Sequence, residues 1–277
     1  MTGFDVRAVV RYLLPGQARP VYIASEAGAD AALNIGAEFE EREVQIRDAR
    51  QLNPTASLDQ QGFTLRQHHS AVTDFYDLEA VREQYEAEII PLVLAASGGA
   101  EARVFDHTLR SDSRTIRGQR SIREPAAVIH NDYTDASART RLQDLLSPEQ
   151  TRQRLAGRFA IVNVWRPIKG PVINSPLACC DAATATAAEL VASERRAKER
   201  VGELELVSFS PVHQWYYYPL MTPDEVVLIK TFDSATDGRA RRSVHTAFDN
   251  PLATVDAPPR ESIESRLLVF FDDVSGG

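Results

Sequence analysis

Hydrophobic and polar residues alternate along much of the chain with the period of two that is typical of β-strands. In the second half this pattern predicts strands within residues 158–168, 203–219, 225–233, 241–249 and 262–271. Turn-forming residues separate these runs, which indicates an antiparallel sandwich or barrel. Residues 1–70 alternate in the same way and are interpreted as a strand-rich N-terminal extension, whereas the Arg-rich residues 113–125 are expected to form a polar connection.

Helical periodicity is confined to a few stretches. The best of them begins at Asp77, a typical N-cap residue, and ends at Gly98. A second helical stretch is predicted over residues 136–158, with a break near Pro148. One further helical candidate covers residues 187–202. The chain is therefore expected to be mainly β with flanking helices.

Composition and charge limit the classes of function. The 277 residues are 43% hydrophobic and 25% charged, as in an ordinary globular protein, and we expect a single domain spanning residues 1–277. The net charge of −8 provides no basic surface for a nucleic-acid backbone. A small-molecule partner is the better expectation.

The N-terminus and the cysteines indicate a compartment. The first 16 residues have an Arg within their apolar run, unlike a signal peptide, and no stretch approaches the roughly 18 to 20 apolar residues of a membrane helix. Cys179 and Cys180 are adjacent, which suits neither a disulfide framework nor a zinc site. We expect a cytoplasmic protein with no membrane partner.

The chemistry that stands out is an H-x-D pair, His130 and Asp132, after the apolar run "AAVI". On an extended chain these two side chains point to the same side. His213 follows another predicted strand, and two histidines with one carboxylate are the parts of a facial triad for non-haem Fe(II). The alternative is that His130 and Asp132 belong to a turn and that His213 is a core residue.

Cations at strand positions are candidates for binding the carboxylate of a chelating co-substrate. Lys230 lies in the apolar run "VVLIKTFD", where a lone buried ammonium would be costly without a partner. Arg241 has the forked guanidinium that binds carboxylates through two hydrogen bonds. Arg166 is a third candidate, beside Trp165 at a strand end, with a surface role as its alternative. The residues do not choose between these cations.

Longer stretches resemble a known family. The chain is similar to the oxidoreductase family that includes the small component of cephamycin 7α-methoxylation, fungal hydroxylase/desaturases of the aspergillic acid type, and endoperoxide-forming enzymes of fungal meroterpenoid pathways. The resemblance runs from about Val72 to Phe270 and is carried by stretches such as "VIHNDYT", "NVWRPI", "PLACCDA", "HQWYYYPLMTPDEVVLIKTFDS" and "HTAFDNP".

The resemblance implies a double-stranded β-helix (a cupin-like jelly roll) with its core at residues 100–272. It also implies a dioxygenase that uses Fe(II), 2-oxoglutarate and O2. The H-x-D…H triad of the family falls on His130, Asp132 and His213. His245 lies in a matching stretch, with its role open, and Asn131 stands where a hydrophobic residue is common.

The implied function is C–H oxidation of a small molecule (hydroxylation, desaturation, cyclisation or peroxidation) in natural-product biosynthesis. Two alternatives stay open at the level of sequence. One is a non-catalytic jelly-roll binding module with structural histidines, and the other is an accessory subunit of a two-component enzyme. Neither the substrate nor a homodimer or partner enzyme can be read from the residues.

Overall fold

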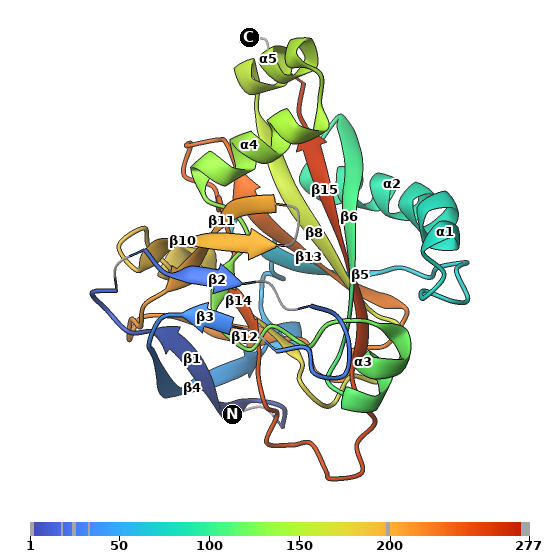
Figure 1. Ribbon diagram of the computed structural model, residues 1–277, viewed down its shortest axis with the longest axis vertical. Coiled ribbons are helices and arrows are strands. Elements are labelled where there is room, and N and C mark those ends of the chain that lie inside the picture. Colours follow the sequence, from blue (N-terminus) through green and yellow to red (C-terminus); the bar gives the residue numbers. More distant parts are fainter. Residues whose placement is uncertain (1–2, 18, 24–25, 33, 198–199, 273–277) are drawn as a thin grey trace.

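Two β-sheets face each other and form the body of the molecule, with helices on the outside (Figure 1). The computed structural model describes residues 3–17, 19–23, 26–32, 34–197 and 200–272. The larger sheet has the strand order β1-β4-β12-β9-β14-β7-β11-β10-β2-β3, and the smaller sheet has the order β5-β13-β8-β15-β6. The prediction of a mainly β protein with flanking helices is confirmed.

In the second half of the chain, β8, β13 and β15 follow the predicted runs closely, whereas the run at 203–219 contains parts of two strands and the run at 241–249 only a short one. The larger sheet contains β1 (Val6–Leu13), β2 (Val21–Ile23), β3 (Asn34–Gly36), β4 (Phe39–Asp48), β7 (His130–Asn131), β9 (Leu177–Cys180), β10 (Leu190–Ala197), β11 (Arg200–Val207), β12 (Trp215–Tyr217) and β14 (His245–Ala247). The smaller sheet contains β5 (Phe63–Gln67), β6 (Glu101–Ser111), β8 (Phe159–Pro167), β13 (Glu225–Asp233) and β15 (Glu261–Phe270).

The helices lie at the periphery. They are α1 (Leu78–Ala80), a π-helical turn (Val81–Tyr85), α2 (Glu86–Ser97), α3 (Arg114–Arg120), α4 (Asp135–Leu145) and α5 (Pro148–Ala156). Asp77 caps the first helix and Gly98 ends α2 in the left-handed region, as predicted. Pro148 begins α5 and so breaks the second helical stretch at the expected place. Among the described residues, no helix is long and apolar enough to span a membrane.

Two predictions of local structure are wrong. The helical candidate at residues 187–202 forms the antiparallel strands β10 and β11, because β2 and β7 provide partners on both sides of the pair. The connection at residues 113–125 contains α3, whose first turn is capped by the side chain of Ser113. In both segments tertiary pairing or a local cap outweighs a weak sequence preference.

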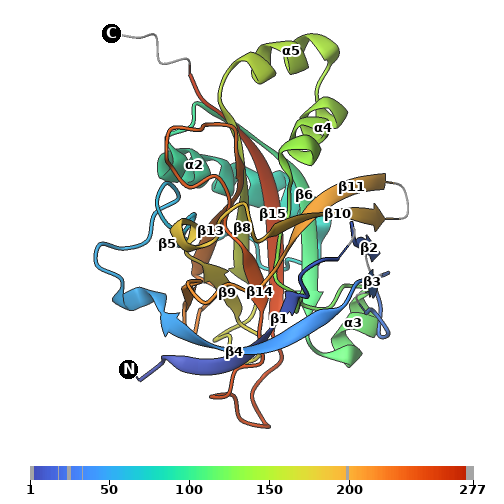
Figure 2. The ribbon, with the colours of Figure 1, turned by 90° about the vertical axis from the view of Figure 1, so that its left-hand side faces the viewer.

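The three central strands of the smaller sheet, β13, β8 and β15, are buried on both faces. Along β8, Val162 and Val164 pack outward in one cluster with Ile89 of α2, while Trp165 packs inward with Cys179 of the larger sheet. Figure 2 shows α2 on the far side of the smaller sheet from β1 and β4. A strand buried on both faces requires apolar residues at nearly every position, so a polar residue facing inward on it needs a partner.

Candidate metal centre

Three side chains with metal-ligand chemistry meet where β7 and β14 pair. His130 on β7 lies directly opposite His245 on β14, and the centres of their rings are 4.5 Å apart. Asp132 follows β7, and its Oδ1 is 3.7 Å from Nε2 of His130. One potential ligand atom from each of the three residues lies within 4.8 Å of the others. Two neighbouring strands therefore bring together two imidazoles and one carboxylate.

Hydrogen bonds set the protonation of both imidazoles. Nδ1 of His130 lies 2.8 Å from the carbonyl oxygen of Val128, and Nδ1 of His245 lies 3.0 Å from that of Ser243. A carbonyl oxygen only accepts, so each Nδ1 must carry the proton. In the neutral ring Nε2 then has its lone pair available, which is the form in which histidine binds a metal. Burial, with His245 nearby, lowers the pKa of His130 to about 4.

Asp132 is held by the smaller sheet. Its Oδ2 accepts hydrogen bonds from Nδ2 of Asn163 at 2.8 Å and from Nε of Arg266 at 2.9 Å. Burial alone would raise the pKa of the Asp132 carboxyl, but Arg266 and the two histidines hold it well below its usual range. Among the described residues, Oδ1 makes no such bond to the smaller sheet, and it faces His130. The carboxylate is therefore oriented to offer one oxygen to a metal.

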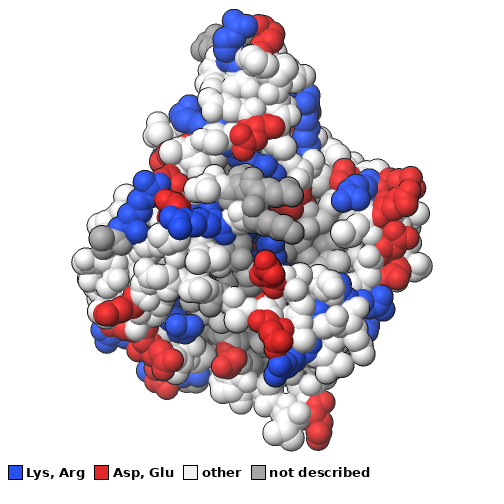
Figure 3. All heavy atoms as spheres, viewed as in Figure 1, with Lys and Arg blue, Asp and Glu red and all other residues white. Residues whose placement is uncertain are grey.

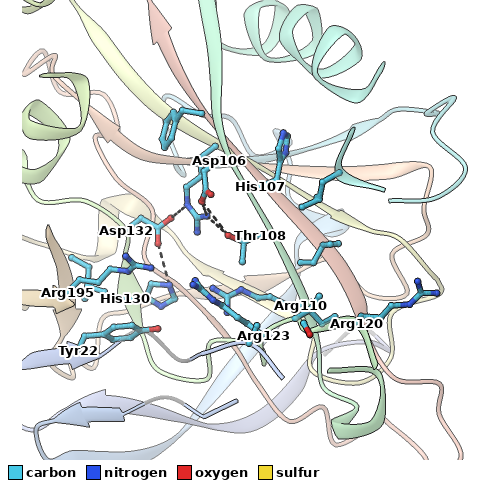
Figure 4. Close-up of a pocket in the computed structure, with 18 of the residues that line it drawn as sticks. Tyr22, Asp106, His107, Thr108, Arg110, Arg120, Arg123, His130, Asp132 and Arg195 are labelled. Atoms are coloured by element: carbon cyan, nitrogen blue, oxygen red, sulfur yellow. Dashed lines mark hydrogen bonds and ion pairs between the residues drawn. The ribbon is translucent and has the colours of Figure 1, made fainter. Parts of the chain in front are cut away.

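These residues fit a divalent metal of the Fe(II) type. The donor set is two neutral imidazole nitrogens and one carboxylate oxygen, and it leaves coordination positions open for other molecules. His130 and Asp132 also line a cavity of about 700 Å³, together with residues 105–110 of β6 and with Arg266 (Figure 4). This volume is in the range of small-molecule sites.

The structure does not bring His213 to this cluster. Its Nδ1 is 3.0 Å from the hydroxyl of Tyr12, and its ring stacks on the Tyr12 ring. His213 precedes β12, which is separated from β7 by β9 and β14, or three strand spacings of roughly 14 Å in all. A sheet delivers side chains to a common point from adjacent strands, so the position that the sequence prediction gave to His213 is taken here by His245.

Lys230 also lies away from the cluster. Its ammonium is paired with Asp59 at 2.7 Å and with Asp233 at 2.9 Å. Val226 and Leu228, at alternate positions before it on β13, pack in the outer cluster with α2. Lys230 therefore belongs to the outer side of the smaller sheet, where two carboxylates already neutralise it.

The other two predicted cations are likewise occupied elsewhere. Arg241 forms an ion pair with Asp135 and donates to the backbone carbonyl of Asp233. Arg166 is only 1% exposed, and it donates to the hydroxyl of Tyr85 and to the carbonyl of Pro223. Neither lines the cavity that His130 and Asp132 share.

A buried cation that the sequence analysis missed is Arg260, which is 3% exposed. Its Nε donates to Ser262 and its Nη1 to the carbonyl of Ser175, and its guanidinium lies 5.0 Å from the ring centre of Trp165. Among the described residues no carboxylate forms an ion pair with it, and burial lowers its pKa to about 9. Nε1 of Trp165 is also buried without a hydrogen-bond partner in the described part of the chain.

One feature of the sequence could have pointed to Arg260. Arg260, Ser262, Glu264 and Arg266 occupy alternate positions at the last strand, and all are buried or nearly so. The positions between them include Ile263, which packs against α2. A strand with a continuous polar face that is nevertheless buried is typical of the wall of a binding site.

Comparisons with known proteins agree with this geometry. The family model described as "Oxidoreductase/YMDC permease-like domain" matches residues 10–270. The hydroxylase/desaturase CTB9 of Cercospora beticola is 33% identical over 261 residues, which are 85% of this chain and 78% of that protein. The Fe(II)/2-oxoglutarate-dependent dioxygenase nvfI of Aspergillus novofumigatus is 34% identical over 238 residues, 82% of each chain.

Solved structures extend the match to the whole fold. The structure of the iron and alpha-ketoglutarate-dependent endoperoxidase NvfI superposes with a TM-score of 0.83 at 28% identity, covering 97% of this chain and 98% of that one. The predicted jelly-roll fold and the resemblance to fungal hydroxylase/desaturases and endoperoxidases are thereby confirmed. The chain therefore belongs to the oxidoreductase family whose model matches residues 10–270, and its relatives include Fe(II)/2-oxoglutarate-dependent dioxygenases and hydroxylase/desaturases.

Proposed function

We propose that the protein is a non-haem Fe(II)/2-oxoglutarate-dependent oxygenase that oxidises a C–H bond of a small molecule in natural-product biosynthesis. The observation that carries this proposal is the protonation of the cluster. Each Nδ1 of His130 and His245 donates to a backbone carbonyl, and Oδ2 of Asp132 is occupied by the smaller sheet. Two Nε2 atoms and one Oδ1 therefore converge as ligands, with no competing soft donor in the cluster.

Fe(II) held by these three residues would supply O2 activation, coupled to decarboxylation of 2-oxoglutarate to succinate and CO2. The chain's own contribution is orientation and charge. Arg266 and Asn163 keep Asp132 ionised and fixed in place, and the backbone carbonyls keep the histidines in one tautomer. We assign this role to the chain as a single domain over residues 1–277.

Arg260 is our candidate for the residue that binds the distal carboxylate of 2-oxoglutarate, in place of Lys230 and Arg241. It is a buried guanidinium with no ion pair among the described residues, and it lies over Trp165, whose Nε1 also lacks a partner. A carboxylate bound beside both groups would accept hydrogen bonds from the guanidinium and from the indole N–H. It would also neutralise a buried charge that is costly without an anion.

Strand pairing supports a position of this candidate near the cluster of His130, Asp132 and His245. On β8 and β15, Asn163 lies opposite Arg266, and both contact Asp132. Trp165 lies opposite Glu264, one pair further along the same face, a step of about 7 Å. An anchor over Trp165 is thus at a suitable separation from the cluster for a five-carbon diacid.

We also propose a cellular compartment and a general class of substrate. Cys179 and Cys180 are both free and buried, which suits a reducing compartment such as the cytoplasm. The cavity of about 700 Å³ is suited to a small-molecule substrate.

The first experiment is anaerobic titration of the purified protein with Fe(II) and 2-oxoglutarate, following the weak visible charge-transfer band of the chelate. We expect the band in the wild type and in His213→Ala, and its loss in His245→Ala. His213→Ala is the matched control, because this histidine contacts Tyr12 and is absent from the cluster. Loss of the band in folded His213→Ala, with retention in His245→Ala, would restore the original assignment.

A further inference from the structure

The cavity beside the metal cluster contains a second group of functional side chains. Arg110 and Arg123 are neighbours in a parallel β-bridge, and Tyr22 lies opposite Arg195 in the parallel pairing of β2 with β10. All four line the cavity of about 700 Å³. The two pairs approach it from opposite sides, one from the β6 edge of the smaller sheet and one from an end of the larger sheet (Figure 4).

The carboxylates that line this cavity already have an ion-pair partner. Nε of Arg266 donates to Asp132, and Nη1 of the same residue donates to Asp106 at 2.7 Å. These are the only two acidic residues that line the cavity in the described part of the chain. Both therefore share Arg266, which also pairs with Glu264.

Arg110, Arg123 and Arg195 make no ion pair with any described residue. Arg110 donates to the backbone carbonyl oxygen of Glu124, and a carbonyl group carries no net charge. Burial lowers the pKa of the Arg123 and Arg195 guanidiniums, and neighbouring arginines lower it further. Three cations thus face the same cavity without an ion pair among the described residues, and the arginines of the cavity wall outnumber its two carboxylates, an arrangement that favours a bound anion.

Other arginines of the cavity wall differ from these three. The guanidinium of Arg120 lies over the ring of Tyr76, 4.4 Å from its centre, and Arg141 lies over the ring of Phe105. Figure 4 shows Arg120 extending away from His130, whereas Arg110 and Arg123 lie side by side next to His130. In the space-filling view, Lys and Arg side chains lie near the centre of this face, interspersed with acidic groups (Figure 3).

We propose that the substrate of this oxygenase is an organic anion, and that Arg110, Arg123 and Arg195 bind its carboxylate or an equivalent group. The inference rests on the proposed function and names the substrate class of that site. Tyr22 and Phe105 in the same wall supply apolar surface for the carbon frame. Guanidinium groups bind carboxylates through paired, charge-assisted hydrogen bonds, which would fix the position of a C–H bond relative to His130 and Asp132.

The test compares two probes of nearly the same shape, benzoate and benzamide, which differ in charge. Binding is measured by calorimetry on the anaerobic Fe(II) and 2-oxoglutarate complex. We expect benzoate to bind the wild type about 10-fold or more tightly than benzamide. The double variant Arg110→Gln/Arg123→Gln should bind both probes equally, and Arg120→Gln should keep the wild-type preference. Arg195→Gln provides a second variant, on a hairpin, if the double variant does not fold.

Equal binding of the two probes to the wild type would overturn the proposal, as would a preference that survives in the arginine variants. Binding of 2-oxoglutarate is measured in the same variants to distinguish the two sources of a carboxylate. Unchanged affinity for 2-oxoglutarate is expected, and a parallel loss would assign these arginines to the co-substrate and overturn the proposal.

The same calorimetry on the metal-free protein separates this inference from the proposed function. Benzoate should keep its preference there, because the arginines and not the metal provide it. A preference that requires Fe(II) would mean direct ligation and would contradict the proposal. Absence of the chelate band in the wild type would contradict the oxygenase function, while the metal-free titration would still decide the anion site.

Discussion

At the scale of single residues, hydrogen-bond partners decide which polar groups are available for chemistry. Lys230 on β13 and Arg260 just before β15 are both buried cations, and each is almost inaccessible to solvent. Lys230 is neutralised by Asp59 and Asp233, whereas Arg260 is bound only to a hydroxyl and a backbone carbonyl among the described residues. Residue type does not separate the two, because the distinction lies in partners that are distant in the sequence.

This difference predicts the effect of Arg260→Gln. Loss of a charge-assisted hydrogen bond to the distal carboxylate costs about 1.5–3 kcal/mol, so the affinity for 2-oxoglutarate should fall roughly 10- to 150-fold. The measurement is the anaerobic charge-transfer titration, with Arg241→Gln as the matched control because that arginine pairs with Asp135. If the control weakens binding and Arg260→Gln does not, Arg241 is the anchor.

At the scale of elements, β13 and its neighbours contain a buried charge network. Asp233 is fully buried, and its Oδ2 forms ion pairs with Nη2 of Arg158 at 2.6 Å and with Nζ of Lys230 at 2.9 Å. Removing one member of such a network leaves an uncompensated charge in a medium of low dielectric constant. The network therefore stabilises the end of β13 and provides a structural role for Lys230.

We expect Lys230→Met to lower the free energy of unfolding by about 3 kcal/mol. Urea denaturation would measure this loss. In the same variant the chelate band of Fe(II) and 2-oxoglutarate should form with wild-type affinity below the denaturation midpoint. A folded variant that has normal stability but no longer binds 2-oxoglutarate would return Lys230 to the site.

The same network predicts a dependence of stability on pH. Burial alone would raise the pKa of Asp233, but the hydrogen bond from Arg158 and the charge of Lys230 lower it below its usual value. The unfolded chain then binds more protons near pH 4, so this contribution is present above about pH 5 and is lost as the pH falls through the folded pKa. Asp233→Asn should show a shallower acid decline in urea midpoints than the wild type between pH 3 and 6. Identical slopes would contradict this assignment.

At the scale of the whole molecule, the candidate metal site of His130, Asp132 and His245 joins the two sheets. His130 and His245 come from adjacent strands of the larger sheet, while Asp132 is held by residues of β8 and β15 in the smaller one. A metal bound to all three would link both layers of the fold. Because the unfolded chain has no such preformed site, binding should stabilise the native state.

Saturation at 100 times the dissociation constant adds about 2.7 kcal/mol, which should raise Tm by roughly 5 to 10 °C for a chain of this size. Anaerobic calorimetry with Fe(II) and 2-oxoglutarate measures the rise, and a chelator should reverse it. His245→Ala should show little change on adding the metal, whereas His213→Ala should respond as the wild type does. An equal rise in His245→Ala would place the metal elsewhere.

Much of this architecture could be predicted from local pattern. The alternating runs of the second half, the helix after Asp77 and the break at Pro148 follow from side-chain periodicity and caps, which act over a few residues. The segment at 187–202 was predicted wrongly, because its strand state depends on pairing with distant strands.

For the site, the sequence by itself determined the H-x-D pair, since two residues two apart on an extended strand share a face whatever surrounds them. Only the tertiary structure decided the third member of the cluster, because strand order places β14 and not β12 beside β7. It also decided which cations have an anionic partner: Lys230 pairs with Asp59 and Arg241 with Asp135, whereas Arg166 and Arg260 contact neutral groups among the described residues. Strand order and ion pairing join residues far apart in the chain, and local periodicity carries no information about such contacts.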